Sequence, residues 1–161
     1  MKIISNYKKI GFILFFSASF SLAQSNQTID EVIVSASLTP LERSETGNSV
    51  TIIDGNLIRD RGVINISQIL RDVPGFAVSQ SGGYGAQTQV RARGAESNHL
   101  LVLIDGVEAN DPSQNDEFVW GTVSIADIEK IEVIRGPQSA ISGSDALAGK
   151  VNIITRSSDQ N

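Results

Sequence analysis

The chain has 161 residues, no cysteine and a formal net charge of −5. The lack of cysteine excludes disulfides, thiol catalysis and cysteine-based metal sites, and the excess of acids argues against a nucleic-acid partner. A chain of this length fits one domain with a modest core and leaves little room for a second.

The N-terminus has the pattern of an export signal. Three lysines precede an apolar run at residues 10–16, and the small residues Ser21 and Ala23 stand where signal peptidase cuts. The run is far shorter than the roughly 18 residues that span a bilayer, which disfavours a membrane anchor. We expect residues 1–23 to be a signal peptide, and the mature chain from Gln24 to carry a charge of about −8.

The next segment, residues 24–48, has no globular pattern. Residues 24–29 are polar, and residues 38–48 mix Pro40, Gly47 and charges without an apolar period. Between them, the β-branched run DEVIVSAS at residues 30–37 predicts a short strand with no obvious partner. We therefore expect a flexible N-terminal segment over 24–48 and a globular domain over 49–157.

The first half of the globular domain predicts strands and short helices. SVTIID at 49–54 has the pattern of a strand, and a short helix is expected from Asp54 to Gly62. A second helix has apolar residues at i, i+3, i+4 and i+7, a cap at Asn65 and a stop at Pro74-Gly75; its apolar residues are Ile66, Ile69, Leu70 and Val73. FAVSQ at 76–80 then leads into a glycine-rich turn.

The second half is richer in strands. TQVRAR at 88–93 alternates, and LLVLI at 100–104 is apolar on both faces, so it predicts a central strand followed by a tight Asp105-Gly106 turn. Ser124 and Asp127 form a capping-box pair for a short helix, and KIEVIR and KVNIITR predict two more strands. Without a regular βαβ repeat, we expect an α+β domain: a small mixed β-sheet with short helices and long loops.

The residues support no enzyme. SGSDALAGKV at 142–151 approaches a phosphate-binding loop, but it has five residues where four are needed and Val151 in place of the hydroxyl residue. His99 is the single histidine, and no nucleophile and base pair can be argued, so no catalytic residue and no cofactor are predicted. Asp111, Asp116 and Glu117 leave calcium open, although they lack the spacing of an EF-hand and a solvated loop is favoured; no metal site is predicted.

Three segments carry a family resemblance: residues 58–83, 91–111 and 128–156. The helix ending in Val-Pro-Gly, the LIDGV hairpin and the strand leading into RGP together resemble the plug of TonB-dependent outer-membrane receptors. NHLLVLIDGV is most similar to the cobalamin-receptor branch. The resemblance covers about residues 30–156 and implies a gating module for uptake of a scarce nutrient, such as a ferric siderophore or cobalamin, inside a barrel of about 22 strands.

The resemblance also assigns residues to partners. DEVIVSA resembles the TonB box, which adds as a strand to the periplasmic domain of TonB: Asp30, Glu31, Val32, Ile33, Val34, Ser35 and Ala36. Two loops match those that face a metal-chelate or cofactor ligand: Gly82, Gly83, Tyr84, Gly85, Asn110, Asp111, Ser113, Gln114 and Asn115. Arg93 and Arg135 match positions that contact the barrel. In the isolated domain we expect both arginines to be solvent-facing and dispensable, and residues 30–36 to be disordered until TonB binds.

The sequence departs from the family pattern in two ways. The usual aromatic before Gly143, glycine at 148 and aliphatic at 150 are replaced by Ser142, Ala148 and Lys150. The chain also contains no β-barrel, so we expect the plug part of a receptor of the cell outer membrane. The alternative is a free-standing periplasmic plug-like module that binds TonB or ligand.

Overall fold

The computed structural model describes residues 32–33, 41–42, 47–83 and 85–157. Three short 3-10 turns, at Ser97–His99, Pro112–Gln114 and Ile125–Asp127, accompany the strands and helices. The strands and helices are, in chain order, β1 Val32–Ile33, β2 Leu41–Glu42, β3 Ser49–Asp54, α1 Gly55–Asp60, α2 Ile66–Leu70, β4 Phe76–Gln80, β5 Thr88–Ala92, β6 Leu100–Ile104, β7 Val107–Glu108, β8 Ile128–Arg135, α3 Ser139–Ser142 and β9 Gly149–Thr155.

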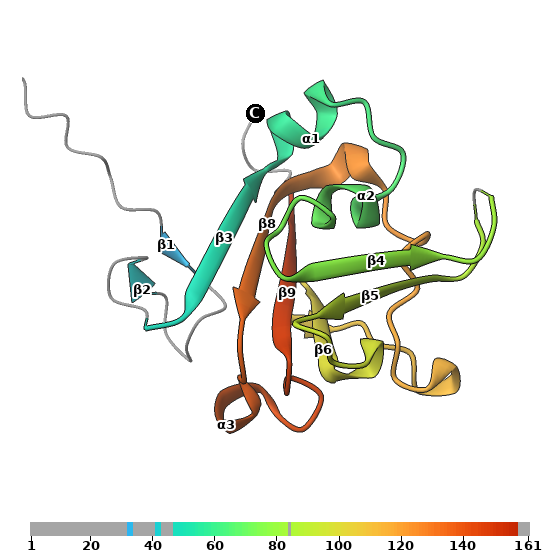
Figure 1. The fold of residues 1–161 in the computed structure, drawn as a ribbon. Helices are drawn as coiled ribbons and strands as arrows, with labels where there is room; N and C mark the ends of the chain where they lie inside the picture. The colour runs from blue at the N-terminus through green and yellow to red at the C-terminus, as the bar shows by residue number, and fades with distance from the viewer. Residues whose placement is uncertain (1–31, 34–40, 43–46, 84, 158–161) are drawn as a thin grey trace, which may run out of the picture.

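A five-stranded mixed sheet forms the frame, in the order β3-β8-β9-β6-β7. Neighbouring strands are antiparallel except β6 and β9, which run parallel. Two small antiparallel pairs, β1-β2 and β4-β5, stand apart from this sheet. The predicted α+β fold, with a small mixed sheet and short helices, is confirmed (Figure 1).

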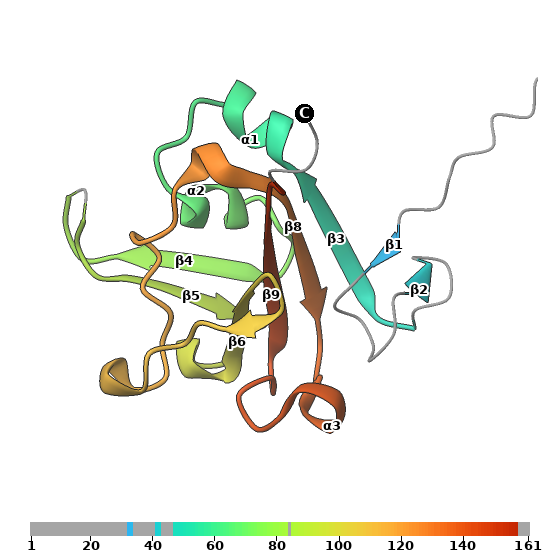
Figure 2. The same cartoon turned by 180° about the vertical axis from the view of Figure 1, so that it is seen from behind.

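The main core lies between one face of this sheet and the β4-β5 hairpin with α2. The hairpin crosses the sheet, and α2 lies beside it at the same face (Figures 1 and 2). The period-2 pattern of β8 and β9 sends Ile131, Val133, Val151 and Ile153 into this core, where all four are fully buried. From the other side come Ile66 and Leu70 of α2 and Val90 of β5.

Several predicted local signals are confirmed. Asn65 caps α2, since its side chain accepts from the Ser67 N–H at 2.9 Å, and Asp54 caps α1 in the same way. The Asp105-Gly106 turn has the two positive φ values, 50° and 82°, that a tight hairpin requires. Among the described residues, no helix is long and apolar enough to cross a membrane.

Two predicted features are wrong. Ser124 makes no side-chain cap, and the expected helix is a single 3-10 turn at Ile125–Asp127. β6 is not the central strand, because only the two-residue β7 pairs with its outer edge; β9 lies at the centre. β6 is apolar on both faces because both faces are covered, with Val102 and Leu101 buried on opposite sides.

The described part of the N-terminal segment also differs from the expectation of disorder. Val32–Ile33 pairs with Leu41–Glu42 as an antiparallel ladder. The Ile33 side chain is fully buried in a small cluster with Val50 and Ile134, on the sheet face opposite the main core. The remaining residues of the TonB-box-like motif lie outside the described residues.

Two departures from the family pattern contact each other on that second face. Lys150 is 4% exposed, and its Nζ donates to Ser142 Oγ at 2.8 Å. Glu132, fully buried on the neighbouring strand, pairs with Lys130 at 2.9 Å. Burial lowers the pKa of Lys150 from its ordinary value of 10.5, and the nearby Glu132 carboxylate opposes this in part. The Ser142 hydroxyl therefore accepts a hydrogen bond from the buried Lys150 ammonium, at a position where the family pattern has an aliphatic residue.

Arg135 is not solvent-facing, which corrects the expectation for it. Its guanidinium donates from Nη1 to the Pro74 carbonyl at 3.2 Å and from Nη2 to Thr51 Oγ1 at 3.1 Å. It thereby ties the end of β8 to β3 and to the turn that follows α2. Arg93 is exposed, as expected, and lies nearby: a Cβ placed on Gly136 would lie 3.5 Å from its Nη1.

We expect Arg135→Ala to destabilise the chain by about 2 kcal/mol, because it removes two charge-assisted hydrogen bonds, of which the one to the Thr51 hydroxyl is partly buried. Arg93→Ala should change stability by less than about 0.5 kcal/mol, since the side chain is exposed. Urea unfolding of both variants and the wild type measures the difference. Equal stability of the two variants would contradict this account of Arg135.

Lys150 should give a pH-dependent stability. Because its folded pKa lies below 10.5, the unfolded chain binds more protons between the two values, so stability rises with pH in that window. We expect the free energy of unfolding of the wild type, relative to Lys150→Met, to increase as the pH approaches 10.5. Denaturant unfolding at steps from pH 7 to the ordinary pKa tests this; a constant difference would refute the burial of a charged lysine.

Candidate functional site

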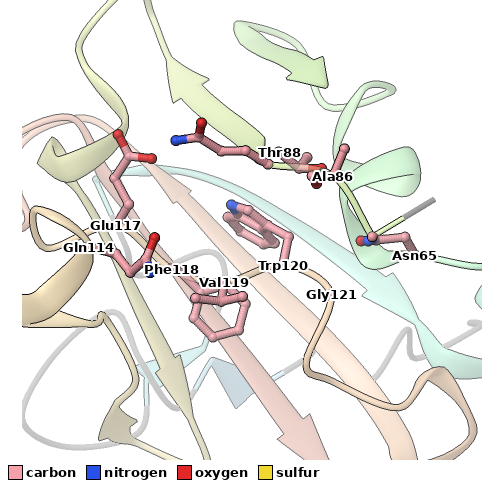
Figure 3. Close-up of a pocket in the computed structure, with 11 residues that line it drawn as sticks. Asn65, Ala86, Thr88, Gln114, Glu117, Phe118, Val119, Trp120 and Gly121 are labelled. Atoms are coloured by element: carbon pink, nitrogen blue, oxygen red, sulfur yellow. Dashed lines mark hydrogen bonds between the residues drawn. The ribbon is translucent and has the colours of Figure 1, made fainter. Parts of the chain in front are cut away.

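Two loops that are distant in sequence meet around a cavity of about 390 Å³. One is the tip of the β4-β5 hairpin, and the other follows β7 and runs from residue 110 to residue 121. Figure 3 shows the lining side chains converging from both loops. The cavity is lined by Asn65, Gly85, Ala86, Gln87, Thr88, Gln114, Glu117, Phe118, Val119, Trp120 and Gly121.

The hairpin tip, which follows the last strand pair Gln80 and Thr88, is rich in glycine. Gly82 and Gly85 have φ values of 146° and 84°, which favour residues without a Cβ. The Gly83 carbonyl accepts from the Ala86 N–H at 3.1 Å and from Gln80 Nε2 at 2.6 Å. These bonds hold Gly85 at the cavity and leave Gly82 and Gly83 exposed; Tyr84 lies outside the described residues.

Asn110 fixes the start of the second loop. Its Oδ1 accepts from the Val102 N–H at 2.8 Å, while its Nδ2 donates to the carbonyls of Leu100 at 3.2 Å and Asp116 at 2.6 Å. The side chain thus prolongs the ladder at the edge of β6 where β7 has ended. Its amide is used within the fold, so Asn110 positions the loop and does not present this group to a ligand.

Asp111 shapes the turn that follows. Its Oδ1 accepts from the N–H and the hydroxyl of Ser113 at 2.9 and 2.7 Å, and these bonds lower the pKa of the carboxyl. An isolated antiparallel β-bridge between the backbones of Asp111 and Glu117 closes the loop. The left-handed backbone at Asn115 and Asp116 makes this reversal of the chain possible. Of the expected ligand-facing residues in this loop, Gln114 lines the cavity, and Ser113 and Asn115 are exposed.

An aromatic pair forms the buried wall of the cavity. Phe118 and Trp120 are 6% and 4% exposed, and their rings meet edge to face with centroids 4.9 Å apart. The indole lies between Glu117 on one side and Asn65 on the other (Figure 3). Sequence reasoning did not single out this pair, although the one tryptophan of the chain, two residues from a phenylalanine after a polar loop, was an available signal.

Glu117 lies in the wall between this cavity and a second of about 380 Å³ lined by Gln89, Arg91, Gly94, Ala95, Glu96, Ser97 and Glu117. Its Oε1 accepts from Gln89 Nε2 at 2.9 Å and from Ser97 Oγ at 2.5 Å. The described residues contain no group of three or more histidines or acids placed to hold a metal ion. Of the three acids that left calcium open, Asp111 is bonded to Ser113 within the loop, Glu117 is bonded to Gln89 and Ser97, and Asp116 is exposed.

The other expected contact, the TonB-box-like strand, is not part of this site. β1 lies on the opposite side of the molecule from the hairpin tip and the loop that follows β7, and the two views agree on this (Figures 1 and 2). The structure therefore brings the two expected ligand-facing loops together and keeps the described part of the motif away from them.

A model of one protein family, described as the TonB-dependent Receptor Plug Domain, matches residues 42–150. The Vitamin B12 transporter BtuB of Vibrio vulnificus strain CMCP6 is 41% identical over 141 residues. The match covers 88% of this chain and 23% of that protein, so the chain spans about a quarter of the relative's length.

Solved structures give the same result. The siderophore receptor PirA from Acinetobacter baumannii is 32% identical with a TM-score of 0.57, over 67% of this chain and 17% of that chain. FpvA of P. aeruginosa, solved with heterologous pyoverdines, is 24% identical with a TM-score of 0.65, over 78% of this chain and 16% of that chain, and supports the fold. The resemblance inferred from the sequence is confirmed at the level of the family: the chain belongs to the TonB-dependent receptor plug domain family.

Proposed function

We propose that this chain gates the uptake of a scarce nutrient as the plug of a receptor in the cell outer membrane. The observation that carries the proposal is the two-sided arrangement of the domain. Both expected ligand-facing loops converge on one cavity, whereas β1, with its TonB-box-like motif, lies on the opposite side. A plug needs this separation, because it receives a ligand on one side and a signal from the periplasm on the other.

The ligand class follows from the relatives. The named relatives are a vitamin B12 transporter, a siderophore receptor and a protein solved with pyoverdines. The 41% identity to a vitamin B12 transporter favours cobalamin over a ferric siderophore. We infer no enzymatic activity, because the proposed role is binding and release.

The partner on the opposite side is the periplasmic domain of TonB. Strand addition uses backbone hydrogen bonds, so a loose sequence such as DEVIVSA, residues 30–36, is sufficient. In the free chain Val32–Ile33 is already paired with β2, and Ile33 is buried. TonB therefore has to displace a two-residue ladder and one isoleucine, which costs about 2 to 3 kcal/mol of apolar burial.

A barrel of about 22 strands would enclose the plug. Arg93 is the stronger candidate for pairing with a carboxylate of the barrel wall, because its guanidinium is exposed. Arg135 already donates to the Pro74 carbonyl and the Thr51 hydroxyl, so only its remaining N–H groups could pair with a carboxylate of the barrel.

The test compares a proline and an alanine substitution at one position of the motif. We expect Val34→Pro to weaken binding of the periplasmic TonB domain by at least about tenfold, since it removes a backbone donor and fixes φ, whereas Val34→Ala should bind as the wild type does. Calorimetry measures binding, and thermal melts check that both variants are folded. Equal binding by the proline variant would remove the assignment of residues 30–36 as a TonB box.

A further inference from the structure

We propose that Glu117 is the specificity residue of the cavity: its carboxylate accepts hydrogen bonds from the ligand and so selects donor groups such as carboxamides, hydroxyls or ammonium ions over anions. The inference rests on the proposed function in one respect, that the hairpin tip and the 110–121 loop face the ligand. It goes further by naming the residue that reads the ligand and the chemical class that it accepts.

A relay of hydrogen bonds orients this carboxylate. Arg91 Nη2 donates to Gln89 Oε1 at 2.9 Å, which leaves Gln89 Nε2 to donate to Glu117 Oε1 at 2.9 Å. Ser97 Oγ donates to the same Oε1 at 2.5 Å. Arginine can only donate hydrogen bonds, so Arg91 holds the Gln89 amide with its oxygen toward the guanidinium. The NH2 group of Gln89 therefore faces Glu117 and donates to its carboxylate.

The relay leaves the second oxygen of Glu117 for a ligand. Oε2 takes no hydrogen bond from the described residues, and it is not among their buried unpartnered atoms, so it is reachable from outside. A carboxylate with one oxygen held by two donors keeps its geometry without a ligand. Its second oxygen can then accept a donor with little further loss of side-chain freedom.

The surroundings of Glu117 set the charge preference. Among the described residues that line the first cavity there is no lysine or arginine, and the polar groups besides the Glu117 carboxylate are neutral: the side chains of Asn65, Gln87, Thr88 and Gln114 and the indole N–H of Trp120. The buried rings of Phe118 and Trp120 keep one wall largely apolar, which strengthens electrostatic interactions at the site. An anion placed here would meet a like charge with no described cation in the lining to offset it.

The nearby cation does not reverse this preference. Arg91 lines the second cavity, on the far side of Gln89, and its Nη2 is committed to the Gln89 amide. Asp116, an exposed acid of the same loop, lines neither cavity. Its left-handed backbone suits asparagine, so Asp116→Asn serves as a matched control that removes one negative charge from the same loop.

The test uses three small probes of similar size: propylammonium, propionamide and propionate. Each is titrated into the isotope-labelled chain of 161 residues, and affinities are read from amide and Trp120 indole shifts in NMR spectra. We expect the wild type to bind propylammonium and propionamide at least about tenfold more tightly than propionate, the difference that one charge-assisted hydrogen bond makes.

Glu117→Gln should reverse this order. Gln89 and Ser97 both donate, so the glutamine has to turn its oxygen to them and its amide donor toward the ligand. Propylammonium should then bind about tenfold more weakly and propionate more tightly, whereas Asp116→Asn should leave all three affinities within about twofold. Glu117→Ala should weaken propylammonium and relieve the repulsion of propionate, but the gain for propionate should be smaller than in Glu117→Gln, because alanine supplies no donor.

Each outcome decides between readings. Propionate bound as tightly as propylammonium by the wild type, or no probe bound at all, would overturn the inference, and neither result depends on a variant that folds. An equal loss of propylammonium in Asp116→Asn would also overturn it, because overall charge would then explain the selectivity. Binding of the periplasmic TonB domain is tested independently with the Val34 variants. Failure of the probe experiment would therefore overturn the role of Glu117 without overturning the proposed function.

Discussion

The placement of β9 between β8 and β6 is the interaction on which the rest of the domain depends. β9 is the last strand among the described residues, yet it pairs with β8 over most of its length and with β6 through five residue pairs, and so joins the two halves of the sheet. The approach of the strands is close: a Cβ on Gly149 would lie 2.6 Å from the Ile134 carbonyl oxygen. Asp105 closes the far end, accepting from the N–H and hydroxyl of Thr155 at 2.8 and 2.6 Å.

The candidate site depends on this frame step by step. β6 is fixed by β9, and the backbone of β6 then binds the Asn110 side chain, which sets where the following loop begins. The loop closes on itself at Asp111 and Glu117 and delivers Glu117 to the donors of β5 and of the turn at Ser97–His99. The position of the carboxylate is therefore determined by backbone pairing that begins more than 30 residues away in sequence.

Local patterns were sufficient to predict most elements, because a strand or a short helix records its own burial in its apolar period. β3, β5, β8 and the capped α2 are of this kind. The order of the strands was not predictable in this way, since LLVLI reports that both its faces are buried and not which strands lie beside it. The Ser142 and Lys150 contact and the Gln89 and Glu117 contact join residues 8 and 28 positions apart, and no spacing rule links such pairs.

The family resemblance predicted two loops that the structure brings to one cavity, but not which side chains line that cavity. Gly85 and Gln114 came from the resemblance and do line the cavity. Asn110 came from the same set, but its side-chain amide is hydrogen-bonded to the backbone of β6 and of Asp116. A motif transfers a loop between relatives because the frame is shared, but side-chain roles depend on hydrogen bonds that single substitutions change.

The strengths of the two ends of the domain also differ in a way that fits a plug. The described part of β1 is held by two residue pairs and the buried Ile33, whereas β8 and β9 share seven residue pairs and the main core. At about 1 kcal/mol for each hydrogen bond, a partner that pulls on β1 detaches it long before the central sheet yields. Under the proposed function, the energy delivered by TonB would first release this strand and then act on a plug whose ligand-facing loops remain folded.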